Sequence, residues 1–368
     1  MTAQPRPGIA LPLQAAIGAA DEDEAYYVYG VVPWPLDPSA LPPSEVAGQA
    51  IDLAQPVYFL PFQDVAAIVR RVALTEFGPA ALETNLQDTR WATAAVLAHQ
   101  QVLDHVLTSL RARSTPRSGG EVARRSTPRS GGEVARDSGG ALDASPPEGT
   151  LHTACPTPVP MKFCTIYRSE EGVGQALAGH YAELAAALAR LAGKCEWGVK
   201  AYCDPAALGQ LLADPDRDVG TFGERVRSLQ AQRTGASAGA AYFVRKKLEA
   251  ALAEATGALS DEITTHSHQR LAARADGAVA NPPRDHDRSP NGRAETMVLN
   301  AAYLVADERL EAFRAELLLL EEEYGAAGFR YELTGPWAPY NFVAGPESEQ
   351  PGAEERTVEA TDGTPGHG

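Results

Sequence analysis

Apolar side chains in the first half of the chain follow two different spacings. β-branched and aromatic residues gather in runs typical of strands at residues 26–32, 51–53, 57–60 and 65–72. From residue 79 to residue 110 the apolar positions recur with a helical spacing, and the candidate core contacts are Trp91, Leu97, Leu103, Val106, Leu107 and Leu110. A further apolar run at residues 161–167 predicts a buried strand that closes the same sheet.

One long helix is predicted to follow that strand. Ser169 is a suitable N-cap, Glu170 and Glu171 fall in the electropositive first turn, and Gly193 is a natural stop. Apolar residues recur at helical spacing between these limits, at Val173, Leu177, Tyr181, Leu184, Leu188 and Leu191. The first half is therefore expected to be a mixed domain, a small sheet with helices, over residues 25–193.

The second half shows the pattern order β-α-β-β-α-β. A strand at residues 195–203 places Trp197, Val199 and Ala201 on one face, and residues 221–256 are mostly helical. Two more strands are expected around residues 263–279 and 297–305. A helix capped by Asp307 follows, with an apolar stripe at Leu310, Phe313, Leu317, Leu320 and Tyr324, and the alternation of Phe329, Tyr331 and Leu333 predicts the last strand. This is the order of a ferredoxin-like domain, so we expect an α+β fold with a second domain at residues 194–344.

Four segments are not expected to belong to a packed domain. Residues 113–124 spell RSTPRSGGEVAR, and residues 125–136 repeat them letter for letter. We interpret residues 111–150 as a flexible insertion, with a basic docking arm as the alternative. The mildly apolar start of the chain, residues 1–24, is expected to be a disordered, untethered tail rather than a signal peptide, and the polar, acidic end at residues 345–368 is also expected to be disordered. Residues 281–293 are expected to be a mobile connection.

Composition and net charge disfavour some classes of binding partner. The chain has 368 residues, 44% of them hydrophobic, and a formal net charge of −16, which disfavours nucleic acid and anionic lipid surfaces. No apolar run approaches the roughly 20 residues needed to cross a bilayer. The four cysteines show no tight paired spacing, which suits reduced thiols in a cytoplasm: Cys155, Cys164, Cys195 and Cys203.

Candidate chemistry is sparse. The Gly172-Val173-Gly174 run has Leu177 where a dinucleotide fingerprint needs its last glycine, so no cofactor is predicted. His266 and His268 could lie on one strand face near Asp285-His286-Asp287, but solvated polar residues are the preferred interpretation over a metal site. Because no catalytic motif is found, we predict a protein that is not an enzyme, with no catalytic, cofactor-binding or metal-ligating residues. An unrecognised metal or nucleotide enzyme is kept as a more remote alternative.

Five separated motifs carry a resemblance. They are PMKFCT at residues 160–165, EWGVK at 196–200, YFVRKK at 242–247, LNAAYLV at 299–305 and LTGPWAPYNFV at 333–343. In this order they resemble the gas vesicle synthesis protein L/F family, over about residues 26–343 without the insertion. Cys164 stands where that family usually has glycine, and Ala338 replaces a usual proline.

The resemblance implies a minor gas vesicle component or assembly factor found in the gas vesicle and the cytoplasm. Such a protein would bind the hydrophobic shell protein and other gas vesicle accessory proteins and limit aggregation. Trp337, Tyr340 and Phe342, which follow the last strand, are candidates for the partner contact; the other interpretation is a lid on the core. A ferredoxin-like protein that senses a small molecule is the alternative function, and the oligomeric state is left open.

Overall fold

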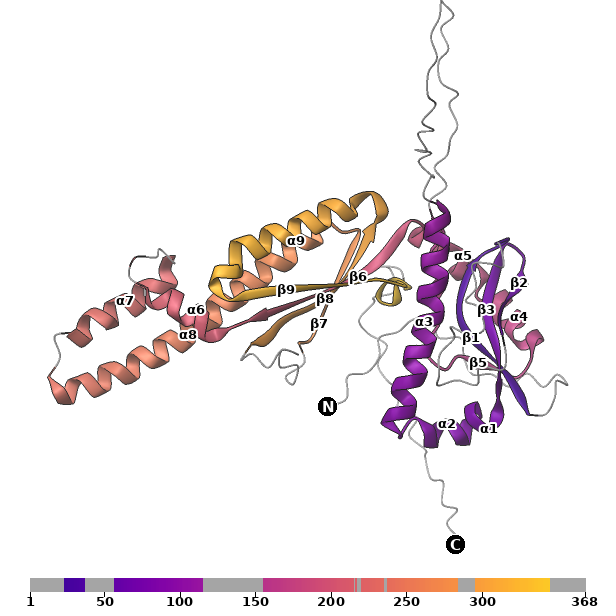
Figure 1. The fold of residues 1–368 in the computed structure, drawn as a ribbon, viewed down its shortest axis with the longest axis horizontal. Coiled ribbons are helices and arrows are strands. Elements are labelled where there is room, and N and C mark those ends of the chain that lie inside the picture. Colours follow the sequence, from indigo (N-terminus) through magenta and orange to yellow (C-terminus); the bar gives the residue numbers. More distant parts are fainter. Residues whose placement is uncertain are drawn as a thin grey trace, which may run out of the picture.

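The protein contains two antiparallel sheets with helices packed on them (Figure 1). The computed structural model describes residues 23–36, 56–114, 155–214, 216, 220–234, 237–283 and 295–344. The predicted strand at residues 51–53, nearly all of both tails, and most of the insertion and of the connection predicted at 281–293 lie outside the described residues. The predicted α+β class is confirmed.

The first sheet is built around β1 (Glu24–Pro33), which is central. Its strand order is β2-β3-β1-β4, with β2 at Val57–Phe62, β3 at Val65–Ala73 and β4 at Val159–Pro160, while β5 (Ile166–Tyr167) also pairs with β1. Alternate residues of β1 face opposite sides, so Tyr27 and Tyr29 belong to one core and Tyr26 and Val28 to another. This sheet is thus buried on both faces.

Helices cover each of those faces. Helix α3 (Thr89–Ser114) packs on the Tyr27 side after the short α1 (Leu74–Phe77) and α2 (Pro79–Asn85), while α4 (Glu170–Gly179) and α5 (Tyr181–Leu191) pack on the other side (Figure 1). The α3 core contacts from Leu103 to Leu110 are confirmed, but the prediction for Leu97 is wrong, because that side chain points outward and is 52% exposed.

Two predictions around Ser169 need correction. Of the strand expected at 161–167, only β5 at its end forms; β4 precedes the predicted range, and between the two lies a turn in which Cys164 has a φ of 62°. That left-handed conformation favours glycine and interrupts the extended backbone. The apolar side chains of the run therefore reach the core from a turn rather than from a strand. The expected single helix breaks at His180 into α4 and α5. The cap itself is confirmed, because Ser169 Oγ accepts a hydrogen bond from the Gly172 N–H at 3.1 Å, and Gly193 has a positive φ of 71°.

The second sheet has the strand order β7-β8-β6-β9. Its strands are β6 (Lys194–Cys203), β7 (Gly277–Asn281), β8 (Thr296–Ala306) and β9 (Phe329–Trp337), and all neighbours are antiparallel. Trp197, Val199 and Ala201 lie in one core as predicted, and Cys195 and Cys203 are buried thiols at opposite ends of β6.

The strand predicted to begin near residue 263 is wrong, because helix α8 (Ala238–Ala272) continues through that region. Ile263, Ser267 and Leu271 recur every four residues and are all buried, which is a helical pattern that the neighbouring threonines and histidines obscured. Helices α6 (Pro205–Ala213) and α7 (Gly220–Thr234) precede α8. The predicted helical stretch at 221–256 is confirmed as α7 and the first part of α8.

Helix α9 (Leu310–Tyr324) buries its predicted stripe, with Phe313 and Leu320 fully inaccessible. Asp307 is not its cap: it lies in a 3-10 turn (Asp307–Arg309), and Oδ1 of its carboxylate contacts Arg111 of α3 at 2.6 Å. Short 3-10 turns at Gly325–Ala327 and Tyr340–Phe342 flank β9.

Several contacts join the two sheets. Leu107 of α3 belongs to the core of the second sheet, whereas Ala338 and Val343 belong to the two cores of the first. Helix α7 and the first part of α8 extend away from both sheets as an arm (Figure 1), while the last part of α8 packs on the second sheet. No helix in the described part of the chain is long and apolar enough to cross a membrane.

Candidate functional site

The three predicted contact residues lie where β9 ends and the chain returns to the first sheet. Trp337 is half-buried, and its Nε1 donates to Thr334 Oγ1 at 3.4 Å. Tyr340 is 37% exposed, with its ring 6.3 Å from that of His99. Phe342 is half-buried beside Gly277. The three rings therefore face different neighbours and do not gather into one aromatic cluster.

Two polar side chains fix this segment, and neither was predicted. Both oxygens of the buried Glu196 carboxylate accept hydrogen bonds from Asn341, at 2.9 Å from its backbone N–H and 2.6 Å from its Nδ2. Burial raises the pKa of Glu196, and the two Asn341 bonds oppose that rise only in part. Arg190 of α5 donates to the carbonyl oxygens of Phe342 and Val343, at 2.8 and 2.7 Å. The segment thus fastens one sheet to the other.

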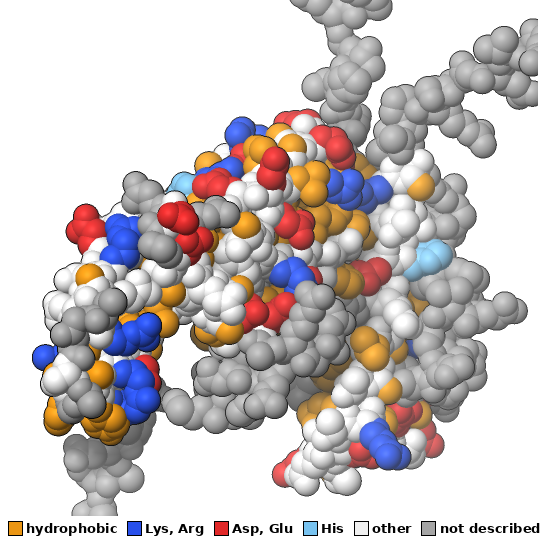
Figure 2. Space-filling model, turned by 60° about the vertical axis from the view of Figure 1, so that its left-hand side comes forward, with side chains coloured by type: hydrophobic (Ala, Val, Ile, Leu, Met, Phe, Trp, Pro, Cys, Tyr) orange, Lys and Arg blue, Asp and Glu red, His pale blue; other side chains and the backbone are white. Residues whose placement is uncertain are grey.

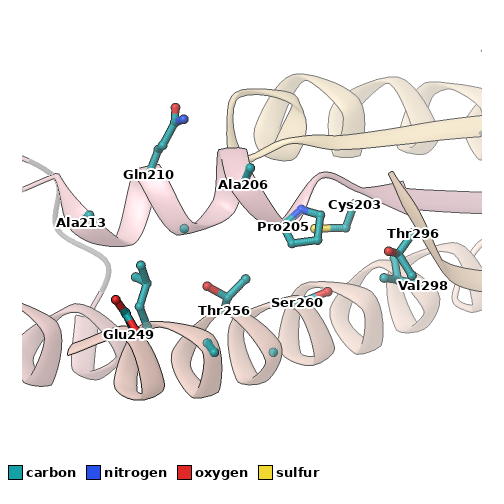
Figure 3. A pocket seen from close by; sticks show the side chains of 14 residues that line it. Cys203, Pro205, Ala206, Gln210, Ala213, Glu249, Thr256, Ser260, Thr296 and Val298 are labelled. Atoms are coloured by element: carbon teal, nitrogen blue, oxygen red, sulfur yellow. The ribbon is translucent and has the colours of Figure 1, made fainter. Parts of the chain in front are cut away.

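A well-formed hollow lies elsewhere, between α6 and α8. It is an open groove of about 710 Å³ (Figure 3). Asp204 follows β6 directly and caps α6, because its Oδ1 accepts the N–H of Ala206 at 2.9 Å, while Pro205 occupies the first turn. This sharp turn sets α6 alongside α8 and leaves a channel between them.

Small and apolar side chains line most of this groove. Ala206, Gly209 and Ala213 come from α6, and Leu252, Ala253 and Gly257 from α8. A methyl group placed on Gly209 would be in ordinary contact with Thr256 Oγ1 at 3.7 Å and with Leu252 Cδ2 at 3.9 Å, so α6 and α8 approach each other closely at this point. The groove therefore suits an apolar chain segment better than a charged ligand.

Polar residues also line the groove, and they include Gln210, the charged Glu249 and Thr296. Thr256 and Ser260 lie on α8, and Cys203 lies at the inner end, where β6 runs into α6 (Figure 3). Burial raises the pKa of the Cys203 thiol, which keeps it protonated and weakly nucleophilic. The groove is therefore a candidate binding surface.

Replacing Gly257 with alanine should stabilise the protein. No atom lies within 4 Å of the position of the new methyl group, and alanine is favoured over glycine in a helix by about 1 kcal/mol. Urea unfolding should show a gain of that size. Gly328→Ala is the opposite control: its φ is 90° and its methyl group would sit 2.8 Å from Ala207 Cβ, so that variant should be destabilised. A loss of stability for Gly257→Ala would contradict the open groove.

The histidine pair predicted on a strand lies on helix α8 instead. Residues two apart on a helix point about 200° away from each other, and the two side chains have separate partners. His266 Nδ1 lies 2.7 Å from the Tyr324 hydroxyl, and His268 Nδ1 lies 2.8 Å from the Tyr303 hydroxyl. Residues 285–287 are outside the described part of the chain. Among the described residues, no group of three or more His, Cys, Asp or Glu could hold a metal ion.

Several known proteins are similar to this chain. Gas vesicle protein L from Streptomyces sp. (strain CB03234) is 26% identical over 289 residues, which is 78% of this chain and 84% of that protein. Gas vesicle protein F from Haloferax mediterranei is 48% identical over a local match of 50 residues, 14% of this chain and 23% of that protein. The crystal structure of GvpF from Anabaena sp. PCC7120 aligns with a TM-score of 0.49 at 17% identity, covering 87% of this chain and 96% of that one.

A family model supplies the decisive comparison. The model described as gas vesicle synthesis protein GvpL/GvpF matches residues 25–113 and 149–344, which is well over half of the chain. Apart from Glu24 at the start of β1, both sheets, the groove and the Trp337 segment lie within the matched residues. The resemblance carried by the five sequence motifs is confirmed, and the chain belongs to the GvpL/GvpF family of gas vesicle synthesis proteins.

Proposed function

We propose that this protein is an assembly factor and minor component of gas vesicles, present in the vesicle and the cytoplasm, that binds the hydrophobic shell protein and other accessory proteins and limits aggregation. The observation that carries the proposal is the open apolar groove between α6 and α8 in a member of this family. The strand order of the second sheet, with α8 and α9 on it, supports the further proposal of a ferredoxin-like domain over residues 194–344.

The physical need for such a factor is simple. A shell subunit with one face that repels water aggregates unless that face is covered before the subunits join. An apolar helix laid into a groove between two helices is a common way to cover such a face. The chain also carries a net charge of −16, which would keep the complex dissolved.

Filling the groove should abolish this activity. Ala253 lies on α8 and lines the groove, so Ala253→Trp would occupy the space that the partner needs. When the shell protein is co-expressed with the wild-type chain, we expect most of it to remain soluble; with Ala253→Trp it should become insoluble.

Ala258→Trp is the matched control. Ala258 is an exposed residue of the same helix and is not among the residues that line the groove, so the same indole there should leave shell-protein solubility unchanged. Melting temperatures of both variants should match the wild type. Solubility that is unaffected by Ala253→Trp, or by the chain itself, would overturn the proposal.

Trp337, Tyr340 and Phe342 remain proposed as a second contact surface, supported by the 37% exposure of Tyr340. The small-molecule-sensing alternative is not favoured by the family match. A thermal-shift screen would detect such a ligand, because saturation at about 100 times Kd stabilises a protein by about 2.7 kcal/mol.

A further inference from the structure

We infer that a second copy of this chain docks head to tail on the first, with the arm tip of one copy seated on the α9 face of the next. The arm tip is defined as Tyr242, Phe243, Arg245, Lys246 and Lys247 at the start of α8. The α9 face is defined as Glu311, Leu318, Leu319, Glu321 and Glu322.

The arm tip combines exposed aromatic rings with positive charge. Tyr242 and Phe243 are 52% and 68% exposed, and their ring centroids lie 5.7 Å apart. Arg245 lies over the Tyr242 ring, 5.4 Å from its centroid. Glu249 forms ion pairs with Arg245 and Lys246, so this single carboxylate balances only part of the positive charge of the three cations of the arm tip. The tip is therefore a basic, aromatic surface on a strongly acidic protein.

Charge along the whole arm agrees with this description. Residues 220–254 contain six basic and three acidic side chains, while the full chain carries −16. Figure 2 shows hydrophobic and basic side chains gathered at the free end of the arm.

The α9 face has the complementary chemistry. Leu318 and Leu319 are 66% and 51% exposed, so these two side chains do not contribute to the core beneath α9. Glu311, Glu321 and Glu322 are exposed around them. Residues 307–324 contain seven acidic and only two basic side chains. An apolar pair ringed by carboxylates matches an aromatic pair ringed by cations, which is the complementarity that selects a partner surface.

The arm tip cannot reach the α9 face of its own chain. Arg270, near the end of α8, forms an ion pair with Glu316 of α9. Tyr242 precedes Arg270 on the same continuous helix by 28 residues, which at about 1.5 Å per residue is roughly 42 Å. The two surfaces can therefore meet only between copies. Because they are different surfaces, each contact leaves a free tip and a free α9 face, so the association grows into a ring or a chain of copies.

Sedimentation velocity of the full-length chain tests this inference. At about 50 mM salt the weight-average mass should rise with concentration beyond that of a dimer, and about 500 mM salt should reduce the association. The arm variant Arg245→Glu with Lys246→Glu should weaken the association at least about tenfold, since opposed like charges repel.

A charge exchange supplies the decisive comparison. Glu321→Lys with Glu322→Lys should also weaken self-association, and a single chain that carries all four substitutions should associate again, because both charges of the contact are then reversed. Arg90→Glu with Lys162→Glu, two exposed positions elsewhere, should associate as the wild type does. A chain that is monomeric under all these conditions, a closed two-fold dimer, or association untouched by the arm and α9 variants would overturn the inference.

Discussion

Replacing Phe313 with alanine should lower the free energy of unfolding by about 3–5 kcal/mol, the usual cost of deleting a buried phenylalanine ring. Phe313 is completely inaccessible, and its ring centroid lies 5.3 Å from that of Tyr303 in the core of the second sheet. The alanine would leave a cavity between α9 and β8 that neighbouring side chains fill only in part. Denaturant unfolding of both proteins measures the difference directly.

Leu318→Ala is the control on the same helix. Leu318 is 66% exposed, so its truncation should change stability by less than about 0.5 kcal/mol at concentrations where the chain is monomeric. Equal losses for the two variants would mean that α9 presents a different face to the sheet.

The stability of the wild type should fall as the pH is lowered from about 7.5 to about 4.5, and His99→Gln should remove most of this pH dependence. Burial lowers the pKa of His99 to about 4, and its Nδ1 lies 2.9 Å from the Tyr27 hydroxyl. In the unfolded chain the pKa is about 6.5, so on acidification the unfolded state takes up a proton before the folded state does. The stability that the neutral imidazole confers is present above about pH 6.5 and is lost as the pH falls towards 4.

The size of this loss follows from the pKa difference. At 1.36 kcal/mol per pKa unit, acidification to about pH 4.5 should cost the wild type about 2.5 kcal/mol more than His99→Gln. Burial also raises the pKa of the partly exposed Asp104 to about 6, which acts in the opposite direction, so only the difference between the two proteins is diagnostic. Urea unfolding at both pH values gives that difference, and parallel losses in the two proteins would show that His99 is not the buried group responsible.

The strands and helices with a regular apolar spacing could be predicted from the sequence. β1, β3, β6 and β9 alternate or run apolar because one or both faces are buried, and the α9 stripe recurs every three or four residues. Prediction failed where tertiary packing overrides local preference. Ile263 to Leu271 carries β-branched residues yet continues α8, and Cys164 holds a left-handed turn inside an apolar run.

The candidate groove could not be predicted in the same way. Its two walls, Gly209 on α6 and Gly257 on α8, are far apart in the chain, and small residues leave no recognisable motif. The segment with Trp337 was found from its aromatic residues. Its anchors Arg190 and Glu196 were not, because a hydrogen bond to a distant backbone carbonyl, as from Arg190, or from a distant backbone N–H, as to Glu196, leaves no trace in the spacing of residues.

Site-specific photo-crosslinking is the most direct test of the central claim, that the groove between α6 and α8 binds the shell protein. A benzophenone side chain at Ala206, which lines the groove, should form a covalent adduct with co-expressed shell protein, whereas the same group at the exposed Arg90 should not. A third probe at Trp337 tests the second proposed surface. Adducts from Ala206 are the predicted result; adducts from Trp337 without any from Ala206 would contradict the account and move the binding site to the end of β9.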